Sequence, residues 1–245
     1  MGRFEDKVVL VTGSSSGIGE ATARAFDAEG ASVVVNSASS VDAGEKVASE
    51  LARATYVRAD VSDAEASERL IHDTIDRFGR LDVLVNNAGV TEVIPHHDLD
   101  AVTDEIFRRI FEVNVLGTFR LTKLALPHLE AHGDGAVVNV TSVAGVRPTG
   151  SSVPYAVSKA ALNHLTALLA KVTGPEVRVN AVAPGLVRTP WTQDWGPVHD
   201  AMQTMAPLGR SAEPTDIAPV IVDLAASSYT TGQVVVVDGG FSLTT

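Results

Sequence analysis

Seven short runs rich in β-branched residues alternate with longer amphipathic segments, and this alternation constrains the fold more than any other feature of the sequence. The runs are almost continuously apolar, as expected of strands that are buried on both faces of a sheet. Strands that alternate with helices predict parallel strands joined by helical crossovers. The sequence therefore predicts an α/β fold, a doubly wound parallel sheet of about seven strands with helices on both faces.

The same pattern predicts the positions of the elements. The expected strands are residues 7–11, 32–36, 55–59, 81–86, 136–141, 177–182 and 233–237, and the clearest expected helices are residues 19–29, 45–51, 65–78, 104–129 and 155–172. No linker, repeat or low-complexity tract divides the chain, so we expect one domain over residues 1–245. Residues 190–214 carry four prolines and both tryptophans, and we expect an inserted segment of helix and loop there.

The charge balance and the absence of cysteine limit the classes of function. The formal net charge is -11, which disfavours nucleic acid and anionic membrane surfaces as partners. A chain without cysteine has no disulfide, no catalytic thiolate and no thiolate-bound zinc, which suits a reducing compartment. The N-terminal residues do not resemble a signal peptide or a membrane anchor. We therefore expect a cytoplasmic protein.

The sequence VTGSSSGIG follows the first expected strand and opens the first expected helix. Glycines in such a turn let the backbone approach a pyrophosphate, and the helix N-terminus supplies N–H groups to the anion. The alternative is a glycine-rich turn that only packs a helix on a strand. The position of the motif, directly after the first strand and before the first helix, favours the phosphate-binding interpretation over this alternative. The residues assigned here to a dinucleotide are Gly13, Ser15, Ser16, Gly17, Ile18 and Gly19.

The end of the second expected strand bears on the choice between NAD and NADP. A carboxylate usually binds the adenosine ribose at this point, but the sequence has Asn36, Ser37, Ala38 and Ser39 there. No carboxylate in this stretch repels a 2′-phosphate and no arginine binds one, whereas the serines can donate hydrogen bonds to it. We therefore expect NADP(H) to be slightly preferred over NAD(H).

The sequence YAVSK places Tyr155 and Lys159 four residues apart, on the same side of an expected helix. A nearby ammonium lowers the pKa of a phenol, which makes it usable as a general acid or base. Ser142 follows the fifth expected strand, at the sheet edge where ligands bind in such folds. It can hold a carbonyl oxygen, although Thr141 and Ser151 are competing hydroxyls.

These ordered motifs together resemble the short-chain dehydrogenase/reductase family in its single-domain, Rossmann-type form. The resemblance runs from Lys7 to about Gly240, and the patterns are similar to those of 3-oxoacyl-acyl-carrier-protein reductases. It rests on TGSSSGIG, ADV at 59–61, NNAG at 86–89, VNVLGTF at 113–119, Ser142, YAVSK and PGLVRT at 184–189. NADP-type members often have a basic residue where this chain has Ser16 or Ala38.

The resemblance implies an NAD(P)-dependent oxidoreductase that interconverts a ketone and a secondary alcohol. By resemblance, Tyr155 is the general acid or base, Lys159 lowers its pKa and contacts the nicotinamide ribose, and Ser142 positions the substrate oxygen. Asn114 is similar to the asparagine that completes a proton relay through water. No metal ion is needed in such a site.

Further cofactor contacts are also implied by the resemblance. They are Asp60 and Val61 at the adenine, Asn87, Ala88 and Gly89 behind the cofactor, and Val187 and Thr189 at the carboxamide, with Pro184 and Gly185 of the same motif also expected to bind the cofactor. The family also implies a homotetramer.

Several alternatives remain open at this point. A non-catalytic dinucleotide-binding or sensor protein has the same fold, although it would be expected to lose Tyr155, Lys159 or Ser142. An epimerase or dehydratase usually carries a larger substrate domain. Residues 190–214 are expected to form a lid over an apolar or ring-bearing small molecule, or else to pack on the core. His96 and His97 are expected to be exposed loop residues, although they can also line the pocket.

Overall fold

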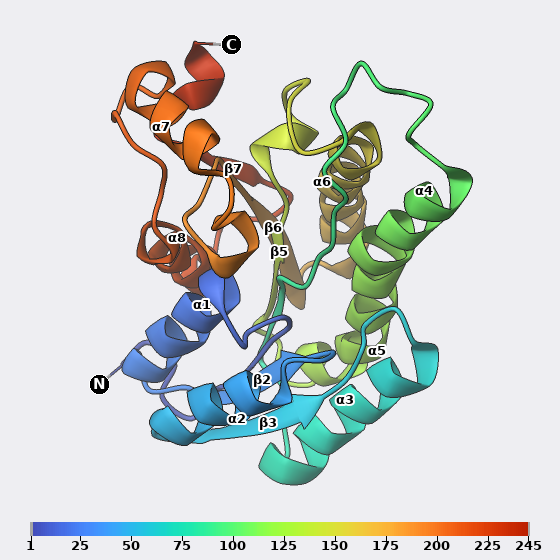
Figure 1. Cartoon of the computed structure of the whole chain (residues 1–245). Helices are drawn as coiled ribbons and strands as arrows, with labels where there is room; N and C mark the ends of the chain where they lie inside the picture. The colour runs from blue at the N-terminus through green and yellow to red at the C-terminus, as the bar shows by residue number, and fades with distance from the viewer. Residues whose placement is uncertain (1, 245) are drawn as a thin grey trace.

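The computed structural model describes residues 2–244, and a seven-stranded parallel sheet forms its centre (Figure 1). The strand order is β3-β2-β1-β4-β5-β6-β7, so the direction of winding reverses between β1 and β4. Ligands bind in such sheets outside the carboxyl ends of the strands at this reversal. The predicted doubly wound α/β fold is confirmed. The strands are β1 Val8–Val11, β2 Ser32–Ser37, β3 Ala54–Arg58, β4 Val83–Asn86, β5 Gly135–Val140, β6 Val177–Pro184 and β7 Val234–Val237.

Helices cover both faces of the sheet, as the apolar runs require. Helices α1, α2 and α8 pack on one face, and α3, α5 and α6 pack on the other. No helix within residues 2–244 is long and apolar enough to cross a membrane. The helices are α1 Gly17–Ala28, α2 Val41–Glu50, α3 Ala64–Phe78, α4 Asp104–Phe111, α5 Thr118–Glu130, α6 Val153–Thr173, α7 Gly196–Met205 and α8 Pro214–Ala226.

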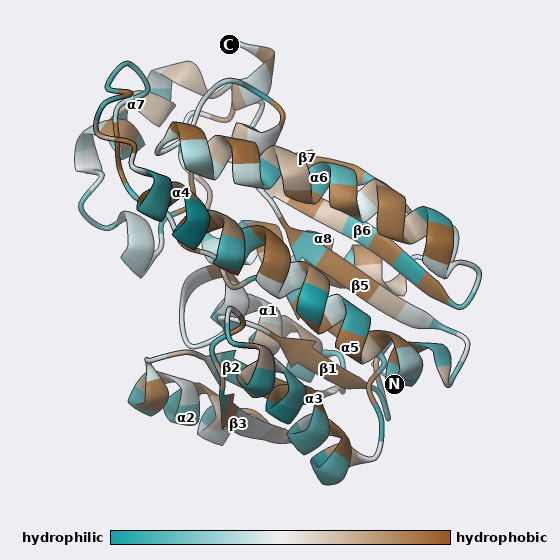
Figure 2. Ribbon diagram, turned by 90° about the vertical axis from the view of Figure 1, so that its right-hand side faces the viewer, coloured by the Kyte–Doolittle hydropathy of each residue, from teal (hydrophilic) through white to brown (hydrophobic). Residues whose placement is uncertain are grey.

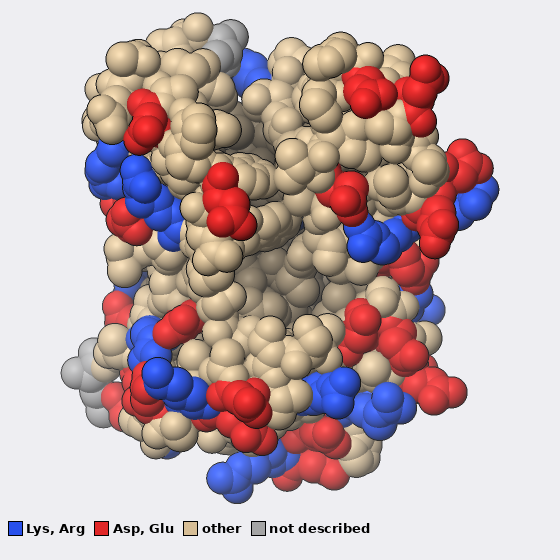
Figure 3. Space-filling view, viewed as in Figure 1, with Lys and Arg blue, Asp and Glu red and all other residues tan. Residues whose placement is uncertain are grey.

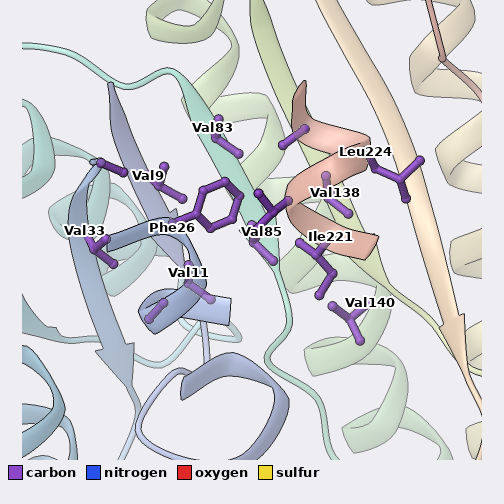
Figure 4. Close-up of a cluster of buried hydrophobic side chains, with 14 of the residues drawn as sticks. Val9, Val11, Phe26, Val33, Val83, Val85, Val138, Val140, Ile221 and Leu224 are labelled. Carbon is purple, nitrogen blue, oxygen red and sulfur yellow. The ribbon is translucent and has the colours of Figure 1, made fainter. Parts of the chain in front are cut away.

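The core between the sheet and the α1–α8 pair is built largely from strand valines and two phenylalanines, and Figure 4 shows Phe26 among the valines. Phe26 of α1 is fully buried and meets Phe4 edge-on, with ring centroids 4.9 Å apart. Ile221 of α8 packs into the same cluster. Burying a side chain of this size contributes about 1.5–3 kcal/mol to stability. This core fixes α1, and with it the glycine turn, against the sheet.

Helix α6 begins where the sequence supplies a cap. The Ser152 hydroxyl accepts a hydrogen bond from the Tyr155 N–H at 3.4 Å, and Pro154 occupies the first turn, where no N–H is needed. Tyr155 therefore lies in the first turn of the helix, facing the carboxyl edge of the sheet. Lys159 follows one turn later and is buried.

The helix predicted over residues 104–129 is helical without a break from 104 to 130, but it is not regular throughout. A π-helical turn, Glu112–Gly117, separates α4 from α5. The Asn114 amide within it bonds both backbone groups of Val90, in the loop after β4, at 2.8 and 3.0 Å. A π-helical turn widens a helix locally, and such turns recur at functional sites. The hydrophobic period alone did not reveal it.

Residues 190–214 form an irregular segment beside the sheet, as expected. A 3-10 turn, Pro190–Thr192, precedes α7, and a bridge between Val187 and Ala212 returns the chain to the sheet edge. Met202 and Ala206 pack on Val143. The segment is therefore attached to the core along one side while Trp191 stays 47% exposed.

Candidate active site

A cleft of about 970 Å³ opens at the carboxyl ends of β1, β4, β5 and β6. Figure 3 shows it as a hollow in the middle of the face, walled almost entirely by residues that are neither acidic nor basic. Most of the predicted site residues line this cleft. They are Gly13, Ser15, Ser16, Gly17, Ile18, Asn87, Ala88, Gly89, Ser142, Tyr155, Lys159, Pro184, Gly185, Val187 and Thr189.

The glycine turn forms one end of the cleft and has the geometry that a pyrophosphate requires. Gly17 has a φ of +58°, and a Cβ there would lie 3.1 Å from the Thr189 methyl group. The Ser16 side chain makes no capping bond to α1, so it does not occupy the N–H groups of the first turn. Gly19 lies behind the turn, where a Cβ would come within 2.3 Å of the Gly13 carbonyl oxygen. These residues fit a dinucleotide phosphate bound at the N-terminus of α1.

The NNAG motif at the end of β4 lines the cleft and also holds neighbouring backbone in place. The Asn87 amide donates to the Thr12 and Gly13 carbonyls at 2.8 and 2.9 Å, which fixes the glycine turn. At Gly89 the backbone of this loop comes close to two side chains of the site. A Cβ there would lie 3.3 Å from Asn114 Oδ1 and 3.5 Å from Lys159 Nζ. Thr12, which sequence reasoning missed, accepts the Asn87 N–H at 3.0 Å.

The predicted adenosine-binding residues lie outside the cleft, along the ends of β2 and β3. The Asn36 amide is buried and donates to the Val57 and Ala59 carbonyls, while its oxygen accepts the Gly13 N–H at 3.3 Å. Ser37 is also buried. Ala38, Ser39 and Asp60 are exposed and Val61 is buried. The structure thus joins the end of β2 to the glycine turn through Asn36.

Ser142, Tyr155 and Lys159 converge at the other end of the cleft. Ser142 follows β5, and its hydroxyl hydrogen bonds with the Tyr155 phenol. Lys159 Nζ donates to the Val140 carbonyl at 2.9 Å and lies 5.6 Å from the centroid of the Tyr155 ring. The predicted trio is therefore brought together, with a buried cation beside a phenol and a hydroxyl.

The pKa of Tyr155 is raised overall, and the expected effect of Lys159 on it remains a prediction. Burial raises the pKa of Tyr155 to about 12, and the hydrogen bond with Ser142 opposes this shift only in part. Burial also lowers the pKa of Lys159 to about 8. Desolvation disfavours the charged form of each of these two groups. At neutral pH the phenol is protonated and able to donate a proton.

Asn114 lies behind the trio and does not line the cleft. Besides Val90, its amide nitrogen donates to Ser158 Oγ at 3.0 Å, and Ser158 donates to the Tyr155 carbonyl at 2.7 Å. Its side chain therefore ties the π-helical turn to the first turn of α6. The predicted part of Asn114 in a proton relay remains a prediction.

The competing hydroxyls both line the cleft and both have partners. Thr141 is buried and donates to the Val182 carbonyl at 3.0 Å. Ser151 Oγ lies 2.6 Å from Thr91 Oγ1, which joins the loop after β4 to the loop before α6. Of the three hydroxyls, Ser142 is the one bonded to Tyr155.

The outer half of the cleft is apolar and aromatic. The Trp191 ring meets the Tyr155 ring edge-on, with centroids 6.2 Å apart. Sequence reasoning missed several wall residues, although loops at the carboxyl edge of a parallel sheet are where ligand contacts are expected. The missed wall residues are Val93, Ile94, Pro95, Val143, Ala144, Leu186, Asp194, Val198 and Phe241.

The two adjacent histidines separate in the structure. His96 is half-buried and lines the cleft, so the expectation of an exposed residue is wrong for it, whereas His97 is exposed. Within residues 2–244 no three His, Asp or Glu side chains are grouped as metal ligands would be.

Comparison with known proteins agrees with this arrangement. Residues 13–242 match the family described as enoyl-(acyl carrier protein) reductase. The chain is 53% identical over 242 residues to a Streptomyces violaceoruber protein whose name assigns it as ketoacyl reductase 2 of the granaticin polyketide synthase. That alignment covers 98% of this chain and 97% of the relative.

Two further comparisons extend the likeness to a reductase and to a solved structure. A 3-oxoacyl-[acyl-carrier-protein] reductase of Thermotoga maritima is 38% identical, over 97% of this chain and 98% of the relative. A short-chain dehydrogenase/reductase (glucose/ribitol dehydrogenase) structure from Brucella melitensis superimposes with a TM-score of 0.92 and 33% identity, over 98% and 99% of the two chains. The protein is therefore an oxidoreductase that belongs to the short-chain dehydrogenase/reductase family.

Proposed function

We propose that this enzyme reduces a ketone to a secondary alcohol, or runs the reverse reaction, with NAD(P)(H) as cofactor and Tyr155 as general acid or base. One observation carries the proposal. The Ser142 hydroxyl, the Tyr155 phenol and the buried Lys159 ammonium adjoin one another at the far end of a cleft that begins at the glycine turn.

Each side chain has a part in moving one proton. A nicotinamide held in the cleft would supply the hydride for the carbonyl carbon, or accept it in the reverse direction. Ser142 donates a hydrogen bond to the carbonyl oxygen, and Tyr155 gives that oxygen its proton as negative charge develops on it. The protonated phenol, with its pKa of about 12, suits the direction of reduction. Lys159 stabilises the phenolate that remains.

We propose NADP(H) as the preferred cofactor. Asn36 and Ser37, at the end of β2, are neutral and buried, so neither repels a 2′-phosphate. The remaining predicted contacts, including Asp60 and Val61 at the adenine and Val187 and Thr189 at the carboxamide, stay predictions.

We propose that residues 190–214 form the lid of a site for an apolar, ring-bearing ketone. The support is the aromatic contact of Trp191 with Tyr155 and the apolar walls of the outer cleft. The ketoacyl reductase name of the Streptomyces relative supports a ketone of polyketide type. Removing the indole of Trp195, which also lines the cleft, should raise the Michaelis constant for the substrate more than that for the cofactor.

The homotetramer, the cytoplasmic location and the single domain also stay proposals. Support for assembly comes from α5 and α6, which lie on the same side of the sheet (Figure 2) and each expose apolar side chains. Phe119 of α5 is 42% exposed, and Leu168 and Val172 of α6 are 50% and 74% exposed. Exposed apolar patches of this kind mark protein interfaces.

The decisive test is a titration with NADPH and NADH followed by a search for turnover. The purified enzyme should bind at least one of them and oxidise it stoichiometrically with an aryl ketone, seen as loss of nicotinamide absorbance. Tighter binding of NADPH is the expected result. Binding of neither nucleotide would contradict the proposed function, and binding without turnover of any ketone or alcohol would favour a non-catalytic binding protein.

A further inference from the structure

The end of β3 carries an arginine that the sequence pattern did not connect with the cofactor. Arg58 is the last residue of β3 and pairs in register with Ser37, the last residue of β2. Its Nε donates to the Ala38 carbonyl at 3.1 Å. The guanidinium is thus held across the turn between β2 and α2, although it is distant from that turn in sequence.

Arg58 has no carboxylate partner within residues 2–244, although the protein is acidic. Most arginines of the chain lie within 4 Å of a carboxylate. Among the described residues, Arg58 forms no such ion pair. Asp60, two residues later, directs Oδ1 to the Ser62 backbone and hydroxyl at 2.9 and 2.7 Å. An exposed, positioned guanidinium without a carboxylate is available to an anion.

The side chains of the β2–α2 turn leave the solvent side of the Arg58 guanidinium uncovered. Ser37 Oγ donates to the Ser40 carbonyl at 3.1 Å and lies 2.9 Å from the Tyr56 hydroxyl. The Tyr56 ring packs so closely on Gly44 of α2 that a Cβ there would come within 2.3 Å of it. Ser37 is therefore engaged and buried beneath the turn. Ala38, Ser39 and Ser40 are exposed above it, beside Arg58.

The same turn is continuous with the phosphate end of the cleft. Asn36 Oδ1 accepts the Gly13 N–H at 3.3 Å, so the end of β2 and the glycine turn are in direct contact. In this fold the adenosine ribose of a dinucleotide lies at the end of the second strand. A charged group on the ribose 2′-oxygen would therefore meet the turn that Arg58 spans.

We propose, on the basis of the proposed function, that Arg58 is the specificity-determining residue of the cofactor site and binds the 2′-phosphate of NADP(H). Ser37, which was expected to donate to this phosphate, instead supports the turn from below. Nε of Arg58 is bonded to the Ala38 carbonyl, so the two terminal guanidinium nitrogens donate to the 2′-phosphate. Ser39 and Ser40 donate to it through their hydroxyls. A hydrogen bond to a charged group contributes about 1.5–3 kcal/mol, which corresponds to roughly 10–100-fold in affinity.

The test compares Arg58→Gln with wild type in titrations with NADPH and NADH. The NADPH dissociation constant should rise about 10–100-fold, while that for NADH changes by less than about threefold. Ala38→Asp places a carboxylate beside the intact guanidinium and should weaken NADPH binding to a similar extent. The matched control is Arg69→Gln, which removes an exposed arginine on α3 and the same unit of charge, and should alter neither constant.

A second titration, with 2′,5′-ADP and 5′-AMP, isolates the 2′-phosphate from the nicotinamide. Wild type should bind 2′,5′-ADP more tightly, and Arg58→Gln should abolish most of the difference. Equal weakening of both nucleotides, or no weakening of either in a variant whose melting temperature is unchanged, would overturn the role of Arg58. Turnover with NADH and no preference for NADPH would also overturn it while leaving the oxidoreductase intact. Failure to bind any nucleotide would contradict both proposals.

Discussion

The two walls of the substrate end of the cleft are built on different physical principles. The inner wall consists of Ser142, Tyr155 and Lys159, carried by the end of β5 and the first turns of α6. The outer wall consists of residues 190–206. Hydrogen bonds to the Val140 carbonyl and the Ser152 hydroxyl fix the inner wall within a strand end and a helix turn. The outer wall is held instead by an apolar cluster around Met202, by the buried His199, and by the Thr192 bond to the Val187 carbonyl. The inner wall therefore suits chemistry that needs fixed distances, and the outer wall suits adaptation to substrate shape.

Replacing Tyr155 by Phe tests the inner wall and should have the largest effect. The variant keeps the ring and its contact with Trp191 but removes the proton that the carbonyl oxygen receives. Because general acid catalysis contributes about 10²–10⁴-fold, kcat should fall by about that factor while cofactor affinity is unchanged. Steady-state kinetics and a nucleotide titration measure the two effects.

Trp191→Phe is the matched control, since it alters an aromatic ring that touches the same tyrosine from the outer wall. It should leave kcat within about twofold. A Tyr155→Phe enzyme with near-normal turnover would show that the proton comes from another group.

Replacing Lys159 by Met tests whether the inner wall costs stability. Burial lowers the pKa of Lys159 from 10.5 to about 8. Between these pH values the unfolded chain binds more protons than the folded one, so the unfolding free energy should rise with pH across this window. At pH 7 the buried ammonium is unfavourable, and the variant should be more stable than wild type by about 1–2 kcal/mol, after the lost bond to Val140 is allowed for.

Urea denaturation of both proteins at pH 7 and pH 10 measures this difference. The advantage of Lys159→Met should shrink at pH 10, where the wild-type amine is largely neutral when folded. Lys171→Met, at an exposed position on α6, is the control and should show no such dependence. A variant that is less stable than wild type at pH 7 would mean that Val140 and Tyr155 compensate the buried charge fully.

The inner wall was largely predictable from sequence, and the outer wall was not. Ser142, Tyr155 and Lys159 occupy positions set by strand ends and helix spacing, which a sequence pattern records. The pKa of Tyr155 was not predictable, because it depends on how deeply the ring is buried when the chain folds. The π-helical turn at Asn114 was missed for a similar reason, since the amide finds its partners in a loop 24 residues away.

Positions that depend on contacts across the sheet edge were missed as well. His96 reaches the cleft because the Ile94 N–H bonds the Ser151 carbonyl at 2.9 Å, which folds the loop after β4 over the site. Arg58 meets the β2–α2 turn through the register of β3 with β2. Neither contact leaves a periodic signal in the sequence, whereas the strands themselves were located within one or two residues.

Replacing Trp191 by Ala tests the outer wall. The variant loses the edge-on contact with Tyr155 and part of the apolar wall, and such aromatic contacts contribute about 0.5–1.5 kcal/mol. The Michaelis constant for an aryl ketone should therefore rise about 2–10-fold while the cofactor affinity stays the same. A small aliphatic ketone should show a lesser change. Equal loss for both ketones would argue that Trp191 positions Tyr155 instead of contacting the substrate.

Replacing His199 by Leu should have the smallest effect on catalysis and separates attachment of the outer wall from its contact with substrate. His199 is 4% exposed, with Nδ1 2.8 Å from Ser211 Oγ and Nε2 3.1 Å from the Thr192 carbonyl, so it joins the start of the outer wall to the chain that follows it. Loss of these bonds should lower the free energy of local opening by about 0.5–1.5 kcal/mol. Limited proteolysis within residues 190–206 should then quicken about 2–10-fold, because cleavage follows the population of the open form. The Michaelis constant should change by about twofold at most, since the lid still closes for most of the time.

His164→Leu, at an exposed position on α6, should alter neither measurement. Unchanged proteolysis in His199→Leu would mean that the apolar cluster around Met202 holds the outer wall without the histidine.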